Sequence, residues 1–206
     1  MRCDMDTKTQ IKAMKEKAER PFGLVSDIYD IVEMFAICTV CIMLLFIFVF
    51  RLTVVNGDSM NKTLTDGEYL IISDVGYKPE RGDIVVAQNV SLTGTYCEPL
   101  VKRVIAVGGD TIKFDFSGIG QWKLFVNGEE VDQSYAYFDV FASTIRPTWD
   151  IPEVIPEGYV FLMGDNRNHS GDSRLEAVGL MDERCIIGHA LMRVFPILKI
   201  GMLTNK

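Results

Sequence analysis

Hydrophobic and polar residues are arranged in two unlike ways along the chain. From Met34 to Phe50 seventeen consecutive positions carry no charge, and Thr39 is their one clearly polar side chain. As a helix this run would be roughly 26 Å long, at about 1.5 Å per residue. With the apolar residues that flank it, the run approaches the ~20 residues that cross a bilayer. The pattern therefore predicts one transmembrane helix over residues 31–52.

Beyond residue 52 the helical pattern gives way to short apolar runs bounded by Gly, Pro or Asp, which is typical of strands. These runs lie at residues 68–73, 83–87, 100–107, 159–163 and 186–194. The segment 122–131 contains Asn127-Gly128, a pair that suits a type I′ turn and predicts a hairpin. Segments 115–121 and 143–158 are typical of loops. The expected fold is a mainly β domain anchored by one N-terminal transmembrane helix.

Three segments follow from this pattern: a polar tail over 1–30, the helix over 31–52 and a β-rich domain over 53–206. A cleavable signal peptide is the alternative, but its charged region would be too long, and no small-residue cleavage site follows the apolar run. Three Lys or Arg lie within 14–33 and two within 51–70. This difference favours a cytoplasmic tail and an extracytoplasmic domain.

The charge distribution argues against nucleic-acid binding, and the cysteine and histidine spacing argues against a metal site. Residues 1–51 carry seven basic and seven acidic side chains, so the whole net charge of −7 falls on the later part. Such an acidic domain would repel phosphate, which argues against nucleic-acid binding. Five cysteines and two histidines show no metal-ligand spacing, so we expect no metal or other cofactor. Pairing of Cys97 with Cys185 is left open.

Three stretches carry the candidate chemistry: GDSMNKTL at 57–64, VKRVIAVGGD at 101–110 and GDNRNHSGDSR at 164–174. In this order they resemble the signature boxes of bacterial type I signal peptidases, which are membrane-bound serine proteases with a Ser-Lys dyad. The resemblance implies an endopeptidase that removes signal peptides from secreted preproteins, cleaving after a small residue. Its partners would be those preproteins and the lipid bilayer.

The resemblance makes Ser59 the nucleophile and Lys102 its base. A serine hydroxyl is a poor nucleophile until a base removes its proton. A lysine can do this only when neutral, and at its ordinary pKa about one lysine in 2,500 is neutral at pH 7. Burial lowers that pKa. In a strand, Lys102 would share a face with Leu100, Val104 and Ala106, which is the apolar setting required.

Four more residues match family positions that support the site, namely Ser170, Asp172, Arg174 and Asp165, and Arg103 is added as a candidate support residue. The resemblance implies that the Ser170 hydroxyl hydrogen-bonds and orients the catalytic lysine. It implies that Asp172 and Arg174 support the site as a charged pair. Asp165 is also expected to support the site, with Arg103 as its candidate partner.

The oxyanion of the tetrahedral intermediate needs hydrogen-bond donors. The Ser59 N–H is the expected first donor, with Gly57 and Met60 beside it in the predicted oxyanion and substrate-binding group. Some family members have a serine hydroxyl at the position of Gly57, so here a backbone N–H or a water must serve as second donor. Two family prolines are also replaced, by Lys62 and within Gly108–Gly109. Both changes remove backbone rigidity.

Other interpretations remain open at this stage. A Ser59–His169–Asp172 triad is compatible with the spacing. A membrane-anchored domain that binds a partner would keep the dyad only as a relic. A self-cleaving regulator would need a DNA-binding module, for which residues 1–30 are too short and too acidic. The aromatic residues of 135–149 are either core or an apolar rim on the outer leaflet.

Overall fold

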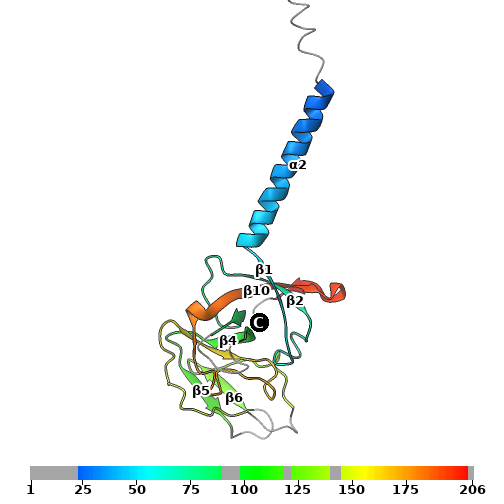
Figure 1. Ribbon diagram of the computed structural model, residues 1–206. Helices are drawn as coiled ribbons and strands as arrows, with labels where there is room; N and C mark the ends of the chain where they lie inside the picture. The colour runs from blue at the N-terminus through cyan, green and yellow to red at the C-terminus, as the bar shows by residue number, and fades with distance from the viewer. Residues whose placement is uncertain (1–22, 90–97, 118–121, 140–144, 204–206) are drawn as a thin grey trace, which may run out of the picture. The chain divides into compact units, whose positions relative to one another are not determined.

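The computed structural model describes residues 23–89, 98–117, 122–139 and 145–203. The chain divides into two units, one ending at Phe48 and a domain that begins at Val49 (Figure 1). The first unit contains helix α2, Gly23–Phe48. Its residues 25–48 are long and apolar enough to cross a membrane by length and composition.

The helix differs from the expected span of 31–52 at both ends. It begins at Gly23, because the polar residues before the apolar run continue the same exposed helix. It ends at Phe48, and Arg51 and Leu52 instead form backbone pairs with Ile72 and Ile71 in a sheet. Strand pairing with a distant segment therefore ends the helix earlier than the hydrophobic pattern predicts.

An eight-stranded antiparallel sheet organises the domain, in the order β1-β2-β10-β3-β4-β8-β9 with β11 paired to β10. Its strands are β1 Arg51–Val54, β2 Tyr69–Ser73, β3 Ile84–Ala87, β4 Leu100–Ala106, β8 Tyr159–Met163, β9 Met181–Asp182, β10 Ile186–Phe195 and β11 Gly201–Met202. A second sheet contains β5 Ile112–Asp115, β6 Lys123–Val126 and β7 Glu129–Glu130. The predicted hairpin joins β6 to β7, and Asn127 and Gly128 have φ of 53° and 80°, as a type I′ turn requires. The mainly β prediction is confirmed.

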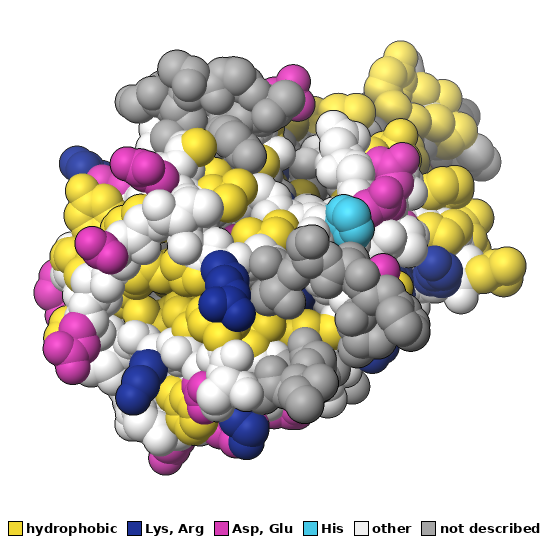
Figure 2. All heavy atoms as spheres, turned by 90° about the horizontal axis from the view of Figure 1, so that it is seen from below, with side chains coloured by type: hydrophobic (Ala, Val, Ile, Leu, Met, Phe, Trp, Pro, Cys, Tyr) yellow, Lys and Arg dark blue, Asp and Glu magenta, His cyan; other side chains and the backbone are white. Residues whose placement is uncertain are grey.

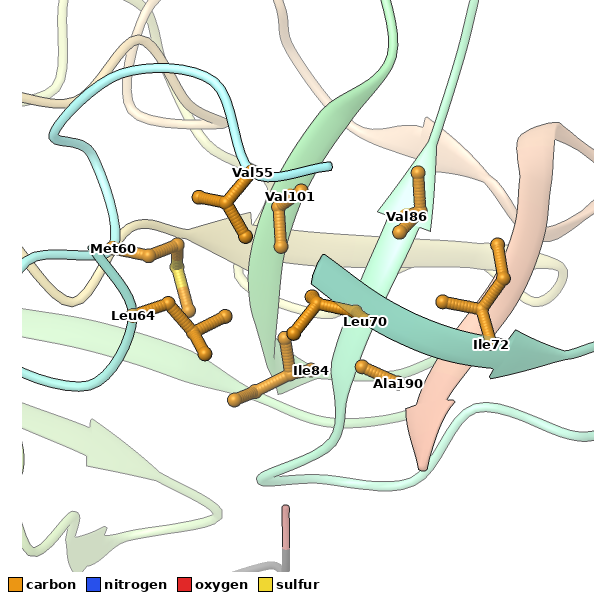
Figure 3. Packing of buried hydrophobic residues seen from close by; sticks show 9 residues of the cluster. All are labelled: Val55, Met60, Leu64, Leu70, Ile72, Ile84, Val86, Val101 and Ala190. Carbon is orange, nitrogen blue, oxygen red and sulfur yellow. The ribbon is translucent and has the colours of Figure 1, made fainter. Parts of the chain in front are cut away.

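One hydrophobic cluster ties the segment after β1 to the sheet. Met60 and Leu64 are fully buried in it and pack with Leu70 of β2, Ile84 of β3 and Val101 of β4. Figure 3 shows the side chains of the segment and of the three strands gathered in this cluster. Truncating a buried residue of this size costs about 2–5 kcal/mol. The candidate nucleophile Ser59 directly precedes Met60, so its backbone is anchored by the core.

The outer face of β1, β2 and β10 is apolar and exposed. Val54 pairs with Tyr69, which pairs with Phe195, so these three side chains share one face opposite buried Leu70. The chain beyond β10 extends the exposed apolar surface, and Leu198 is 99% exposed. We call the whole set the apolar outer face: Leu52, Val54, Tyr69, Phe195, Ile197, Leu198, Ile200 and Met202.

The sequence leaves the aromatic stretch 135–149 open between core and apolar rim, and in the structure most of its described hydrophobic residues are half-buried against the domain. The Arg103 guanidinium lies 4.2 Å from the Tyr135 ring centre, and Phe138 packs against a buried cluster. Tyr137 is the exception, at 44% exposed. Val140 and Phe141 lie outside the described residues.

A large hollow among the described residues lies at the second sheet rather than at the candidate serine. It has a volume of about 910 Å³ and is lined in part by Phe114, Phe125 and Ile151. Figure 2 views this face and shows hydrophobic side chains flooring a hollow among acidic and basic ones. None of the candidate site residues lines this hollow.

The backbone at Lys62 yields a stability prediction. Lys62 has φ of 82°, in the left-handed region that costs a residue with a Cβ about 1–2 kcal/mol. Lys62→Gly should raise the free energy of unfolding by about 0.5–1 kcal/mol, because glycine avoids this cost but loses more entropy on folding. Thermal unfolding of the full chain in detergent measures the change.

Two variants sharpen this test. Lys113→Gly alters an exposed lysine within β5, where glycine should destabilise rather than stabilise. Lys62→Pro should destabilise strongly, since proline holds φ near −65°. A proline variant as stable as the unmodified protein would contradict the left-handed backbone.

Candidate functional site

Ser59 lies in a turn that local hydrogen bonds hold in place. The Asn61 N–H donates to the Asp58 carbonyl at 3.0 Å, and the Leu64 N–H donates to the Met60 carbonyl at 2.9 Å. The chain enters this turn through Gly57, whose φ of 81° favours glycine. The serine is therefore presented by a short, internally bonded turn and not by an extended loop.

Lys102 of β4 brings its amine to the serine. Its Nζ lies 2.7 Å from Ser59 Oγ and 3.0 Å from the Val101 carbonyl oxygen. The residue is 3% exposed, and its strand neighbours Leu100 and Val104 belong to a buried cluster, as strand alternation predicts. A serine hydroxyl and a buried amine in direct contact are the pair that base-assisted nucleophilic attack needs.

Burial changes the protonation of this amine. Loss of water around Lys102 lowers its pKa from 10.5 to about 8, while the negative charge of Asp172 opposes the change and the positive charge of Arg174 adds to it. A pKa near 8 leaves about one amine in ten neutral at pH 7, against about one in 2,500 at the ordinary value. A base that works near neutral pH becomes available.

Two buried ion pairs flank the dyad. Arg103 Nε and Nη2 donate to the two oxygens of Asp165 at 2.8 and 2.7 Å. Arg174 Nε and Nη2 bind Asp172 in the same two-pronged way, at 2.8 and 2.7 Å. Burial alone would raise the pKa of Asp172, but Arg174 more than compensates and the pKa is lowered. The Asp172 carboxylate therefore stays ionised, and in both pairs the structure brings the sequence-predicted partners together.

The family model described as "Signal peptidase, peptidase S26" matches residues 28–195. The chain belongs to this family of peptidases. It is 33% identical to the probable signal peptidase I-1 of Synechocystis sp., over 84% of this chain and 85% of that protein. It is 33% identical to signal peptidase IB of Staphylococcus aureus, over 81% and 91% respectively. Identity to signal peptidase I of Bacillus licheniformis is 34%, over 83% and 90%.

The third box packs directly on the serine turn of this S26 peptidase. The Asn166 N–H donates to the Ser59 carbonyl at 3.0 Å, and a Cβ built at Gly164 would collide with both Ser170 Oγ and the Ser59 carbonyl. Glycine is therefore required by space at this point. Ser170 Oγ is buried and lies near the Asp172 carboxyl, whose pKa it helps to lower, but it forms no hydrogen bond to Lys102, so the expected bond between them is absent.

The residues predicted to bind the oxyanion, Gly57, Ser59 and Met60, differ in whether their N–H groups are free to donate a hydrogen bond. The Gly57 N–H donates to Asp66 Oδ1 at 2.7 Å and is therefore already engaged. The Met60 side chain is fully buried in the core. Within the described residues, the N–H groups of Ser59 and Met60 have no acceptor. The serine amide therefore stays available as a donor, whereas Gly57 contributes neither a side chain nor a free N–H.

The two replaced prolines correspond to backbone that proline could not adopt or fit. Lys62 has φ of 82°, far from the value that a proline ring allows. At Gly108 a Cβ would lie 2.8 Å from the Glu157 Cα, and Gly109 has φ of 85°. Neither departure loosens the turn in the simple way expected, because each position adopts a defined conformation that proline excludes.

The structure does not assemble the alternative triad. His169 is exposed, and in the described part of the chain its imidazole forms no hydrogen bond to Ser59 or Asp172. The carboxylate of Asp172 is occupied by Arg174. The second histidine, His189, stacks on the Tyr77 ring at 4.5 Å between ring centres.

Two residues beside the site had no role in the sequence prediction. Arg167 is 1% exposed, donates to Gln133 Oε1 and has aromatic rings around its guanidinium, so it joins the third box to the segment near residue 135. Asn56 lines a pocket of about 170 Å³ together with Ser59 and Lys102. The motif contains Arg167, but only the folded chain reveals its surroundings.

The sequence leads us to expect no metal site, and it leaves the pairing of two cysteines open. Among the described residues, no group of three His, Cys, Asp or Glu is placed to hold a metal ion. Cys97 lies outside the described residues, so the question of its pairing with Cys185 stays open.

The buried amine predicts a pH-dependent effect on stability. A pKa of about 8 instead of 10.5 means that the charged folded state is disfavoured by about 3 kcal/mol. Lys102→Met should therefore raise the free energy of unfolding at pH 7 by up to about 3 kcal/mol. Between pH 8 and 10.5 the unfolded chain binds more protons, so the native protein gains stability and the difference shrinks.

Thermal unfolding of both proteins across pH 6–11 in detergent tests this expectation. Lys113→Met, which replaces an exposed lysine of β5, is the matched control and should show no such trend. A stability difference that grows between pH 8 and 10.5 would contradict a lowered lysine pKa.

Proposed function

We propose that this protein is a membrane-bound endopeptidase that removes signal peptides from preproteins by a Ser-Lys dyad. The observation that supports this proposal most directly is the 2.7 Å contact between Ser59 Oγ and the buried Nζ of Lys102. Membership of the signal peptidase family supports the same reaction. The names of the relatives supply the substrate class, and the geometry supports the chemistry.

In the first step the neutral Lys102 amine accepts the Ser59 proton while Ser59 Oγ forms a bond to the scissile carbonyl carbon. The carbonyl π electrons move to the oxygen, which becomes an oxyanion near the Ser59 N–H. Collapse of this intermediate breaks the C–N bond, and the protonated lysine gives its proton to the leaving amine. Lys102 then accepts a proton from a water whose oxygen bonds to the acyl carbon. Collapse of this second tetrahedral intermediate breaks the ester bond to Ser59 Oγ, Lys102 returns the proton to that oxygen, and the product acid leaves.

The supporting residues have positioning roles in this proposal. Asp165 with Arg103, and Asp172 with Arg174, hold β4 and the third box around the dyad. We propose that the Ser170 hydroxyl accepts a hydrogen bond from an N–H of the neutral Lys102 once the Ser59 hydroxyl donates to the lone pair of that amine. The Ser170 hydroxyl is buried and forms no hydrogen bond to Lys102 before this rearrangement, which is compatible with the proposal.

The pocket beside the dyad supports a preference for small side chains. Its volume of about 170 Å³ is well below the ~300–1,000 Å³ of pockets for drug-sized ligands. Pro99, Leu100 and Val101 contribute to its wall. A cleavage site preceded by a small residue would fit, whereas a large aromatic side chain would not.

The lipid bilayer is the second proposed partner. Helix α2 supplies a candidate membrane span, and β1 begins only three residues after the helix ends. The apolar outer face includes β1, and an exposed apolar patch of this kind marks an interaction surface. We propose that it rests in the outer leaflet, with the N-terminal tail cytoplasmic as the distribution of Lys and Arg favours.

A cleavage assay tests the enzymatic proposal. Full-length protein in detergent should cut a preprotein once, after a small residue at the end of its signal peptide, as mapped by mass spectrometry. Ser59→Ala and Lys102→Ala should each reduce turnover by at least about 10³-fold, since loss of the nucleophile or base removes the dyad. For the unmodified enzyme, kcat/KM should rise with pH through about 8 and then level off, because the neutral amine is the active form.

Lys113→Ala is the control and should cleave normally. Near-normal turnover of Lys102→Ala, combined with loss of activity in His169→Ala, would contradict the lysine assignment. Failure of the unmodified enzyme to process any preprotein would contradict the substrate class.

Tryptophan fluorescence tests the lipid contact. In vesicles containing brominated lipids, a Leu198→Trp variant of the full chain should be quenched, because its ring would lie among the acyl chains. Val154→Trp, at a position that is also exposed (50%, against 99% for Leu198) but lies outside the apolar outer face, should gain no quenching over the unmodified protein. Equal quenching of the two variants would contradict the proposed contact between the apolar outer face and the bilayer.

A further inference from the structure

The reaction proposed above leaves one requirement unmet. A tetrahedral oxyanion is stabilised by fixed hydrogen-bond donors, usually more than one. The Ser59 N–H is one donor, since it has no acceptor among the described residues. Gly57 carries no hydroxyl, and its own N–H is engaged by Asp66 Oδ1 at 2.7 Å. The Met60 N–H is also without an acceptor among the described residues, so it is one candidate for the second donor, and the side chains at the pocket supply the others.

The side chains that line this pocket narrow the choice. Of its described residues, three have N–H or O–H donors in their side chains: Asn56, Ser59 and Lys102. Ser59 is the proposed nucleophile and Lys102 the proposed base, so each is consumed by proton transfer. Asn56 remains, and its carboxamide can donate two hydrogen bonds without changing its protonation state.

The surroundings of Asn56 suit this role. The residue follows buried Val55, which belongs to the same core cluster as Met60, so both ends of the turn are anchored. Its side chain is exposed and has no hydrogen-bond partner within the described part of the chain. Nothing in that part therefore competes with a substrate for its N–H groups. Asparagine side chains are among the groups that form oxyanion holes in enzymes.

We propose that the Asn56 carboxamide donates a hydrogen bond to the oxyanion and thus replaces the hydroxyl that Gly57 lacks. The inference rests on the proposed function, in which Ser59 attacks the scissile carbonyl. Asn56 is then a catalytic residue, because its Nδ2 contacts the reacting oxygen. The contact strengthens as negative charge develops, so it acts mainly on turnover and little on substrate binding.

Steady-state kinetics of the full-length enzyme on a preprotein test this role. Asn56→Ala should lower kcat by about 100-fold with KM nearly unchanged, which is the lower end of the loss seen when an oxyanion donor is removed. Asn56→Asp should lower kcat at least as much, because a carboxylate cannot donate at neutral pH and repels the oxyanion. Both variants should keep the unfolding temperature of the parent, since the residue is exposed.

A peptide aldehyde ending in a small residue provides a second readout. Its hemiacetal with Ser59 places an oxygen where the oxyanion forms, so Asn56→Ala should weaken inhibition by about the same factor as kcat/KM. The corresponding peptide alcohol cannot form this adduct and should bind both proteins alike. Asn61→Ala is the matched control: the Asn61 carboxamide is bonded to Asp58 Oδ1 at 3.2 Å and lies outside the pocket lining.

The outcomes separate this inference from the function beneath it. If the unmodified enzyme neither cleaves preproteins nor forms the aldehyde adduct, the proposed function fails. If it does both and Asn56→Ala keeps its kcat and its aldehyde affinity, only the role of Asn56 fails. A raised KM with unchanged kcat would also overturn the oxyanion role, since Asn56 would then bind the substrate equally in its ground state.

Discussion

Removal of water from one lysine is the constraint on which the rest of the site depends. The Lys102 amine is buried in the sheet, so its charged form is disfavoured and its lone pair can accept the serine proton. An isolated buried ammonium would be very unfavourable, and the nearby Asp172 keeps its pKa from falling further. The balance between desolvation and these charges sets the pH range in which the dyad can work.

The architecture meets this constraint with neighbouring central strands and two ion pairs. β3 and β8 flank β4 and cover its backbone, while Asp165 and Asp172 hold their arginines in fixed two-pronged geometry. The serine reaches the amine from a separate turn, whose residues Met60 and Leu64 are buried in the same core. The proposed nucleophile and base are therefore positioned by different elements that share one hydrophobic cluster.

Much of this arrangement follows from local sequence patterns, and the remainder depends on contacts between distant segments. Strand alternation is enough to give Lys102 apolar neighbours, and Asn127-Gly128 is enough to predict a hairpin. The helix ends at Phe48 and not at residue 52, because the pairing of Arg51 with Ile72 is a long-range contact that the local pattern does not contain. The bond from Gly57 to Asp66, the missing Ser170–Lys102 bond and the aromatic surroundings of Arg167 likewise require the folded chain.

The burial of both ion pairs also governs how the site responds to its medium. Mobile ions screen charges at a surface within about 8 Å at physiological ionic strength, but they reach buried pairs far less. Arg174 and Asp172 are fully buried, and Arg103 and Asp165 nearly so. When the salt concentration around the domain changes, the geometry of these two ion pairs is therefore insulated from the change, while the net acidic surface of the same domain is not.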